Sequence, residues 1–421
     1  MVRWTHWVHF PLLSIMIWSG LLIYWANDIY WPPFPDSFYG KLGLDHKLAD
    51  GMAIHFFFMW FFALNGFFYF IYLLTSAHWR EFIPRQKATR RYNPVQAVVY
   101  GVIVLMGIGS LITGLAIYKP IQLGWVKNLL GGYENARYLH YLLTVGFILF
   151  FIVHIIQVIR QAIRLGWRHS RSMFEGHGFE ISLVLFVAVF VWIRSQPQKD
   201  GLPAPLRSML EFNEKIAMKL LKVERVDSSP KSSKRGQRVN GDLGLETPLD
   251  ISQWKMNVIT PVGTSQKGTG RLELNMDDIR ALPKTQILTT FKCIEGWSED
   301  MAFGGVKFSD FLKHYHLGTH SGQPPDFENN KNDLYAHVGL ETPDGQYYVS
   351  IDMKSMLSPQ TLLAYEMNGF PLTGDHGAPL RLVIPNKYGV KSLKRVGKII
   401  FSDEKLPDYW GEQGYDWFIG L

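Results

Sequence analysis

The sequence predicts a membrane-embedded bundle of four α-helices with a fifth transmembrane helix, followed by a soluble domain of the α+β class. Three observations support this prediction. Long apolar runs fill the first half of the chain, charged residues gather in the loops between them, and the second half alternates short strand-like runs with turns. With 421 residues, the chain also exceeds the size of one ordinary hydrophobic core.

Four apolar segments are long enough to cross a bilayer, which requires about 20 residues of helix. They occupy residues 4–24, 52–74, 95–118 and 139–159. A fifth apolar segment, residues 179–193, is shorter and spans the membrane only if its polar flanks contribute. We therefore expect a five-span membrane domain over residues 1–195.

Basic residues gather in two loops of this predicted bundle. The loop between the second and third spans contains Arg80, Arg85, Lys87, Arg90 and Arg91. The loop after the fourth span contains Arg160, Arg164, Arg168 and Arg171. Because such loops stay in the cytoplasm, we expect a multi-pass protein of a bacterial inner membrane with a cytoplasmic N-terminus and a periplasmic soluble domain. If residues 179–193 only dip into the membrane, the soluble domain is cytoplasmic instead.

The formal net charge of +7 could indicate nucleic-acid binding. Many of the cations before residue 175 lie in the two loops that flank the predicted spans, and this accounts for the charge without nucleic acid. We therefore expect contact with membrane lipid and no nucleic-acid partner.

Four histidines lie at the predicted spans, where ionisable side chains are costly and usually functional. His140 and His154 share one segment and lie 14 residues apart, which in an α-helix is a rotation of about 40° and a rise of ~21 Å. Both therefore point into the bundle from one helix face, near opposite membrane surfaces. His6 begins the first span on one side, and His55 lies near the start of the second span on the other. Depth pairs His6 with His154 and His55 with His140, which predicts two bis-histidine haem b sites, one per leaflet.

Two further histidines compete for these roles. His9 follows His6 by three residues on roughly the same face and could replace it, whereas His46 lies nine residues before His55 on the opposite face. We interpret His9 and His46 as hydrogen-bonded residues of the membrane interface. The spans also contain the glycines Gly20, Gly66 and Gly114. These glycines could allow close approach of a porphyrin, but ordinary helix packing explains them equally well.

Short motifs mark the first half of the chain. They are Arg3-Trp4-Thr5-His6-Trp7, Leu64-Asn65-Gly66 after His55, Tyr92-Asn93-Pro94, Thr113-Gly114, and the pair His140 and His154. In these motifs residues 1–195 resemble the di-haem cytochrome b family, which includes cytochrome b561 and the membrane subunits of formate dehydrogenase and nickel–iron hydrogenase. The resemblance implies haem b and electron exchange with quinone. It departs from the family at His9, where the family pattern has a non-ligating polar residue.

Residues 196–240 have the composition of a linker. Prolines and glycine break the helix after the fifth span, and residues 228–236 are polar and basic. Between them, apolar residues recur at helical spacing over residues 206–221 with cations opposite, which predicts an amphipathic helix on the membrane surface rather than a buried one. A second domain is then expected over residues 241–421.

Strand-like runs and two helical patterns alternate in this second domain. The runs occupy residues 255–259, 286–291, 347–351, 380–384 and 398–402, and the helical patterns occupy residues 276–282 and 309–315. This alternation favours an α+β domain with a mixed or mostly antiparallel sheet.

Cys293 is the only cysteine in the sequence and ends the second strand-like run. One cysteine excludes an intrachain disulfide framework, a four-cysteine iron–sulfur site and a c-type haem motif. Cys293 is either a small buried residue or a soft thiolate ligand for a metal. As a thiolate, its pKa could be lowered, or an anion attracted, by Lys292 and a basic segment that contains Lys387, Lys391, Lys394 and Arg395. The alternative interpretation of this basic segment is a solvated face.

Longer motifs distinguish between these interpretations of Cys293. They are Glu295-Gly296-Trp297-Ser298, Gly305-Val306, residues 362–369, residues 375–382 and the basic segment 385–395. In them, residues 243–421 resemble the sulfite-oxidase-type molybdopterin domain. The resemblance implies that Cys293 binds molybdenum beside a pterin dithiolene and that Tyr347 lies near the metal. It also implies that cationic residues hold the cofactor phosphate, namely Arg381, Lys387, Lys391 and Lys394.

Two details favour one branch of that family. Glu295 resembles the glutamate that follows the cysteine by two residues in the periplasmic methionine-sulfoxide-reductase branch, and Asn240 corresponds to an active-site asparagine of that branch. Sulfite oxidases continue from their cysteine with a Gly-Asn-Arg-Arg run whose arginine helps hold the oxyanion. Here the stretch ends at Trp297-Ser298 without arginine, and a site without that planar donor binds sulfite poorly.

These features predict an oxidoreductase with molybdenum–molybdopterin and two haems b that uses quinone or quinol as co-substrate and acts on a small molecule. Glu295 and Tyr347 would donate protons to the substrate or orient it. We favour quinol-driven reduction of an S-oxide such as methionine sulfoxide. One alternative is a sulfite dehydrogenase that donates electrons to quinone, and another is a cytochrome b electron carrier whose soluble half is a docking module. The sequence is compatible with a homodimer.

Overall fold

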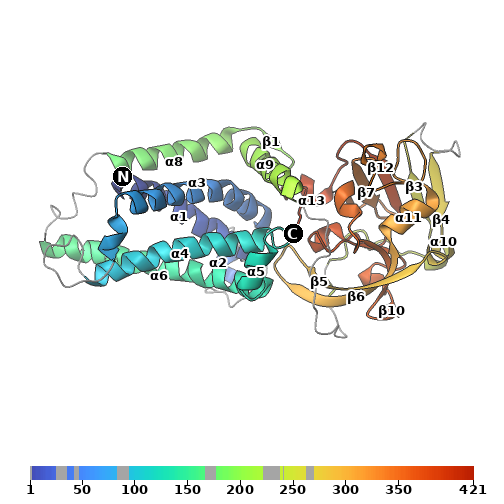
Figure 1. Cartoon of the computed structure of the whole chain (residues 1–421), viewed down its shortest axis with the longest axis horizontal. Coiled ribbons are helices and arrows are strands. Elements are labelled where there is room, and N and C mark those ends of the chain that lie inside the picture. Colours follow the sequence, from blue (N-terminus) through green and yellow to red (C-terminus); the bar gives the residue numbers. More distant parts are fainter. Residues whose placement is uncertain are drawn as a thin grey trace. The chain divides into compact units, whose positions relative to one another are not determined.

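The computed structural model describes residues 2–24, 36–41, 47–82, 94–165, 177–220, 238–239, 241–261 and 270–421. The described residues up to Phe212 form one compact unit, and those from Asn213 onward form a second. Helices make up the first unit and two sheets dominate the second (Figure 1). Several residues named above lie outside the described ranges: His46, Arg85, Lys87, Arg90, Arg91, Tyr92, Asn93, Arg168, Arg171 and Asn240.

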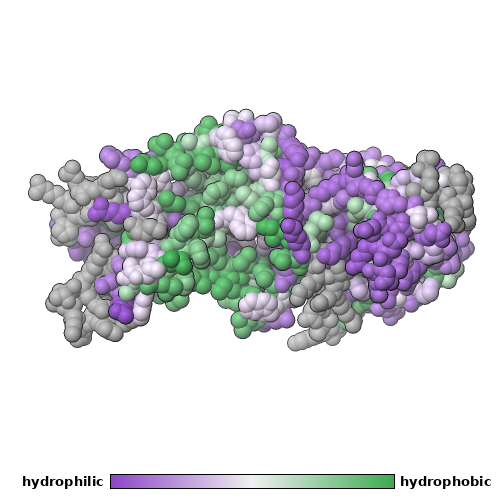
Figure 2. All heavy atoms as spheres, turned by 45° about the horizontal axis from the view of Figure 1, so that its top comes forward, coloured by the Kyte–Doolittle hydropathy of each residue, from purple (hydrophilic) through white to green (hydrophobic). Residues whose placement is uncertain are grey.

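Five long helices form most of the first unit. They are α1 (Val2–Tyr24), α3 (Leu48–Thr75), α4 (Pro94–Tyr118), α6 (Tyr133–Leu165) and α8 (Gly178–Ser195). By length and composition, each of these helices can cross a membrane. Figure 2 shows apolar residues over this unit and hydrophilic residues over the sheets. The predicted membrane bundle with its fifth helix is therefore confirmed.

The shorter elements of the first unit connect these helices. They are α2 (Asp36–Lys41), the 3-10 helix η1 (His78–Phe82), α5 (Gly124–Leu129) and the strands β1 (Gln198–Lys199) and β2 (Leu202–Pro203). Helix α9 (Ala204–Leu220) follows β2 and coincides with the predicted amphipathic pattern. Its Leu206 and Leu210 are buried in the same apolar cluster as Leu12 and Phe58, so this face of α9 packs against protein.

Two helix pairs organise the bundle, since α1 packs along α3 and α4 packs along α6. A Cβ atom at Gly51 would lie 2.8 Å from the Leu22 side chain, so glycine permits the close approach of α3 to α1. Helix α8 lies against α1, where the Ser182 hydroxyl donates a hydrogen bond to the Trp7 carbonyl at 2.6 Å.

Two five-stranded sheets form the second unit. One contains β5 (Lys284–Lys292), β6 (Ser298–Lys307), β9 (Leu362–Met367), β10 (Phe370–Pro371) and β11 (Arg381–Val383), all paired antiparallel. The other has the order β4 (Arg271–Leu274), β3 (Met256–Ile259), β12 (Lys398–Ser402), β7 (His337–Glu341) and β8 (Tyr348–Asp352). Among the strands that the structure describes, only β3 and β12 pair in parallel. The α+β class with a mostly antiparallel sheet is thus confirmed.

Short helices and one large apolar core complete this unit. The α-helices are α10 (Met276–Arg280), α11 (Phe308–Tyr315), α12 (Met353–Met356) and α13 (Tyr409–Glu412). The 3-10 helices are η2 (Ile251–Gln253), η3 (Lys331–Asp333), η4 (Gly374–His376) and η5 (Gly389–Lys391). The core gathers fully buried side chains such as Phe308, Phe311 and Phe401 between strands and helices, and this burial fixes the loops that carry the candidate site.

Candidate functional site

The structure brings the four predicted histidines together as two pairs. The ring centroids of His6 on α1 and His154 on α6 lie 6.2 Å apart, and those of His55 on α3 and His140 on α6 lie 6.4 Å apart. A metal–imidazole bond is about 2 Å long, so one iron held between two imidazoles places the ring centroids ~6 Å apart. Both pairs therefore fit an axial ligand set for haem iron.

Hydroxyl groups orient the imidazoles of the second pair. The Ser19 hydroxyl lies 3.0 Å from Nδ1 of His55, and the Thr113 hydroxyl lies 2.9 Å from Nδ1 of His140. Each hydroxyl donates its own proton to a helix carbonyl, Met16 at 3.2 Å and Gly109 at 2.7 Å, so it accepts the Nδ1–H of the imidazole. Nε2 of each ring is then the nitrogen left to bind iron.

Glycines keep space beside the same two imidazoles. A Cβ atom would lie 3.6 Å from Cε1 of His55 at Gly20, and 3.2 Å from Cε1 of His140 at Gly114. The nearest atoms at both positions belong to a histidine ring, so these glycines serve the imidazoles as well as helix packing. Gly66 differs, because a Cβ there would meet nothing within 4 Å.

His9, the competitor of His6, has other contacts. The Asn65 amide lies 3.3 Å from Nδ1 of His9 and also donates to the Thr5 carbonyl at 3.3 Å. The His9 ring lies 4.8 Å from the ring of Phe62, measured between centroids. The geometry thus places His6 opposite His154 and joins His9 to α3.

Cys293 lies in the tight turn between β5 and β6. The turn closes through hydrogen bonds from the Cys293 amide to the Trp297 carbonyl at 2.9 Å and from the Gly296 amide to the Cys293 carbonyl at 3.0 Å. Gly296 has φ +102°, a conformation that favours glycine. The cysteine is 4% exposed, so the turn presents one buried sulfur at the end of the β5–β6 hairpin.

The surroundings of the thiol favour its protonated form. Burial, followed by the Glu295 carboxylate, raises the pKa of Cys293 to about 12, while Arg238 acts in the opposite direction. Oε2 of Glu295 lies 3.8 Å from Sγ of Cys293 and accepts a hydrogen bond from the Trp297 indole at 3.2 Å. A soft metal cation supplies the charge that displaces the proton, so this environment suits a metal ligand better than a free nucleophile.

Burial and then Asp408 raise the pKa of Tyr347, and Cys293 contributes in the same direction. Its hydroxyl donates a hydrogen bond to the Val390 carbonyl, and its ring packs edge-on against Tyr409 at 5.8 Å. Tyr347 is therefore a neutral, oriented side chain that must leave Val390 before it can donate a proton elsewhere.

Two of the predicted phosphate ligands have carboxylate partners instead. Nζ of Lys387 donates to Asp352 at 2.9 Å and to the Phe418 carbonyl at 2.9 Å. Lys391 donates to the Ser350 carbonyl at 3.0 Å and pairs with Asp408. Both lysine side chains are 1% exposed, so their charges are neutralised inside the fold. In this geometry Lys387 and Lys391 join β8 to the C-terminal segments, and their role as phosphate ligands stays a prediction.

Arg381 and Lys394, the other two predicted phosphate ligands, lie together with His376. The Arg381 guanidinium donates to the His376 carbonyl at 3.1 Å and the Ser392 carbonyl at 3.3 Å, and burial lowers its pKa to about 10. Burial and then Arg381 lower the pKa of Lys394 to about 8. Burial, Arg381 and Lys394 also lower the pKa of His376. Mutual repulsion of these cationic groups is relieved when an anion binds between them.

Buried nitrogen atoms without hydrogen-bond partners also indicate an anion site at this cluster. Among the residues that the structure describes, Nε of Arg381 and Nε2 of His376 are buried without a hydrogen-bond partner. Nδ1 of His376 is already engaged by the Thr373 hydroxyl at 2.8 Å. The residues present therefore fit the phosphate group of a pterin cofactor. The cationic pattern of the sequence did not indicate His376, although this histidine lies in the motif at residues 375–382.

Arg238 is a second residue that the sequence motifs did not reveal. Its guanidinium lies 5.2 Å from the centre of the Trp297 ring, and its amide donates to Glu299 at 3.3 Å. Its charge lowers the pKa of Cys293. The expected absence of an arginine near the cysteine concerned only residues after Cys293, and Arg238 reaches this turn from 55 residues earlier in the chain.

Two family models match this chain. The model of prokaryotic cytochrome b561 matches residues 1–176, and the model of the oxidoreductase molybdopterin binding domain matches residues 244–410. The first range contains all four paired histidines, and the second contains Cys293 together with the cluster of His376, Arg381 and Lys394.

Curated relatives agree with these models. A protein named as the protein-methionine-sulfoxide reductase subunit YedZ1 of Azospira oryzae is 35% identical over 146 residues, which cover 34% of this chain and 50% of that protein. The protein-methionine-sulfoxide reductase catalytic subunit MsrP of Xanthomonas axonopodis pv. citri is 30% identical over 171 residues, 38% of this chain and 48% of that protein.

A mitochondrial sulfite oxidase of Drosophila melanogaster is 27% identical over 166 residues, which cover 34% of this chain and 28% of that protein. The chain thus spans half or less of the length of these three relatives. Taken together, the two family models show that the chain joins a domain matched by the prokaryotic cytochrome b561 model to a domain matched by the oxidoreductase molybdopterin binding domain model.

Proposed function

We propose that this protein is a quinone-linked membrane molybdoenzyme that reduces a small S-oxide, such as methionine sulfoxide, with electrons from quinol. The observation that carries the proposal is the combination, in one chain, of two imidazole pairs spaced for iron, a buried cysteine, and a cationic cluster whose Arg381 lies 5.6 Å from the ring of Phe291, two residues before that cysteine. The names of two relatives, both methionine-sulfoxide reductase subunits, support the choice of substrate class.

In this proposal the histidines hold two haems b at different depths, His6 with His154 and His55 with His140. Cys293 binds molybdenum, and Arg381, Lys394 and His376 hold the phosphate of the pterin. Asn240, which lies outside the described residues, remains a proposed cofactor contact. When bound, the haems supply one-electron transfer and the molybdenum cofactor supplies two-electron oxygen-atom transfer.

The chain's own residues would manage protons and orientation at the site. Reduction of a sulfoxide to a sulfide and water consumes two electrons and two protons, and oxidation of one quinol to quinone supplies both. Glu295 is fixed by the Trp297 indole at 3.2 Å and can carry a proton to the substrate oxygen. Tyr347 orients the substrate through its hydroxyl once that hydroxyl turns away from Val390.

We further propose the arrangement of the chain in the membrane. Residues 1–195 form the di-haem domain, residues 196–240 the linker and residues 241–421 the molybdopterin domain. The arginine-rich loop after α3 and the arginines at the end of α6 support a cytoplasmic location for these two regions in a bacterium, and a periplasmic location for the soluble domain. A homodimer is compatible with this arrangement.

The test combines cofactor analysis with haem re-oxidation. Purified protein should contain molybdenum, pterin and haem b, and quinol-reduced haems should be re-oxidised on addition of methionine sulfoxide. Cys293→Ser should lose molybdenum and re-oxidation while keeping the haem spectrum. Haems that respond to none of a panel of sulfoxides and N-oxides contradict the proposed reaction, and protein free of molybdenum favours the docking-module alternative.

Sulfite oxidation is a second candidate, and Arg238 is the observation that favours it. A guanidinium near Cys293 offers a planar donor for an oxyanion, which the residues after the cysteine lack. In this case sulfite reduces the oxidised haems, and Arg238→Gln raises the KM for sulfite about tenfold or more. Sulfite-dependent haem reduction in the wild-type protein would reverse the proposed direction of electron flow.

A further inference from the structure

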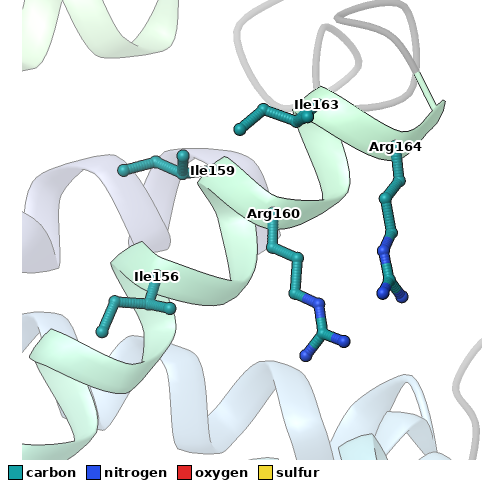
Figure 3. Close-up of a pocket in the computed structure, with 5 residues that line it drawn as sticks. All are labelled: Ile156, Ile159, Arg160, Ile163 and Arg164. Atoms are coloured by element: carbon teal, nitrogen blue, oxygen red, sulfur yellow. The ribbon is translucent and has the colours of Figure 1, made fainter.

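A recess of about 320 Å³ lies on the surface of the C-terminal end of α6. It is lined by Ile156, Ile159, Ile163, Arg160 and Arg164, and Figure 3 shows both arginine side chains extending from the same side of the helix. The three isoleucines are 55%, 52% and 79% exposed. An apolar wall beside two guanidinium groups therefore faces outward from the first unit.

This recess lies on the helix face opposite the haem ligand. At ~100° per residue, the five lining positions centre about 200° around the helix axis from His154. His154 faces the His6 ring on α1, and Ala162, about 80° from His154, is 4% exposed and turned inward. The recess therefore faces lipid and not the space between the helices where iron would bind.

Its depth corresponds to the lipid headgroups. If the midpoint between His140 and His154 is the bilayer centre, Arg160 lies 13 residues from it, or ~20 Å along the helix. The headgroup layer reaches about 20–22 Å from the centre of a bilayer. Side chains on a helix lean toward its N-terminus, so Arg164, one turn farther out, also reaches back toward the headgroups. Ile156 lies ~14 Å from the same midpoint, at the level of the upper acyl chains, whereas Ile159 and Ile163 lie ~18 Å and ~24 Å from it, at the level of the headgroups.

We propose that this recess binds one anionic phospholipid, whose phosphate pairs with Arg160 and Arg164 and whose acyl chain packs on Ile156. Among the described residues, neither guanidinium has an acidic partner, so a phosphodiester supplies the missing charge. A guanidinium fork suits two phosphate oxygens, and basic sites beside membrane helices select anionic headgroups. This inference is independent of the proposed reaction.

The test is native mass spectrometry of the full-length holoprotein in detergent, titrated with phosphatidylglycerol or phosphatidylcholine. Wild type should retain one phosphatidylglycerol with an affinity about tenfold or more above that for phosphatidylcholine. The double variant Arg160→Gln/Arg164→Gln should lose this preference. The conservative variant Arg160→Lys/Arg164→Lys should keep part of this preference, because lysine keeps the positive charge but lacks the planar guanidinium group.

Two controls make the outcome decisive. Arg80→Gln removes a positive charge at the end of a span on the same predicted membrane side and should leave the retained lipid unchanged. An intact haem spectrum shows that each variant is folded. Equal retention of phosphatidylglycerol by wild type and the double variant overturns the proposal, as does an equal loss in Arg80→Gln. Displacement of the bound lipid by millimolar inorganic phosphate would assign the site to free phosphate instead.

Discussion

Hydroxyl contacts distinguish the two histidine pairs at the scale of single residues. His55 and His140 each have a serine or threonine hydroxyl on Nδ1. Among the described residues, His6 and His154 have no side-chain hydrogen bond to either ring. Because a hydrogen bond on Nδ1 makes an imidazole a stronger electron donor, the two proposed iron sites should differ in reduction potential.

Thr113→Val tests this difference. The variant removes the acceptor of the His140 Nδ1–H, which weakens the imidazole as a donor and destabilises ferric relative to ferrous iron. The potential of one haem should rise and its affinity should fall about 10–100-fold, while the other haem is unchanged. A spectroelectrochemical titration measures both effects.

Thr144→Val is the matched control for this experiment. The Thr144 hydroxyl donates only to the His140 carbonyl within α6, at 3.0 Å, and it does not contact an imidazole. A shift of equal size in both variants would mean that the hydroxyl on the ring has no specific role.

At the scale of elements, α4 offers a test of close approach. Gly114→Ala places a Cβ 3.2 Å from the His140 ring, tighter than an ordinary contact, so the ring must move by a few tenths of an ångström. We expect weaker binding or lower occupancy of one haem, measured as the haem-to-protein ratio. Gly107→Ala on the same helix meets nothing within 4 Å and should leave occupancy unchanged. Full occupancy in Gly114→Ala contradicts this role for the glycine.

The helices were easier to predict than the strands. Apolar composition alone predicted all five spans, although α6 (Tyr133–Leu165) extends six residues beyond each end of the predicted segment at 139–159 because its ends are polar. Strand β6 was missed, because Gly304 and Gly305 give it a weak strand pattern. A Cβ at Gly305 would lie 2.2 Å from the Leu363 carbonyl, so the sheet itself requires this glycine.

The candidate site was also only partly predictable from the sequence. Cys293 and the histidines could be selected from residue type and spacing. The sequence could not separate Lys387 and Lys391 from Arg381 and Lys394, because the carboxylates that pair with the first two lie 35 and 17 residues away along the chain. Arg238 is likewise brought to Trp297 only by the fold.

At the scale of the whole molecule, buried ion pairs make stability depend on pH. Burial raises the pKa of Asp352, but the Lys387 charge and hydrogen bonds from Ser355 and Lys387 together hold it below its ordinary value. A carboxylate with a depressed folded-state pKa contributes stability above its unfolded pKa of about 4 and loses it as the pH falls through the folded value.

The free energy of unfolding of the soluble unit should therefore fall steeply below pH ~4. Lys387→Met should reduce stability at neutral pH by roughly 3–5 kcal/mol, since it leaves a buried carboxylate unpaired, and should flatten the acid dependence. Thermal unfolding between pH 3 and pH 7 measures both. Lys255→Met, which breaks an exposed pair with Glu273, should leave stability nearly unchanged. An acid profile unaltered in Lys387→Met would assign the dependence to other groups.

The division of the bundle into α1–α3 and α4–α6 has a consequence for biogenesis. Each imidazole pair takes one ring from either half, and aromatic contacts such as Phe10 with Phe151 also join the halves. Binding of iron by both imidazole pairs would then hold the α1–α3 hairpin and the α4–α6 hairpin together. Cells starved of haem should accumulate an open form of the chain that membrane proteases remove, so haem supply would govern how much of the protein survives.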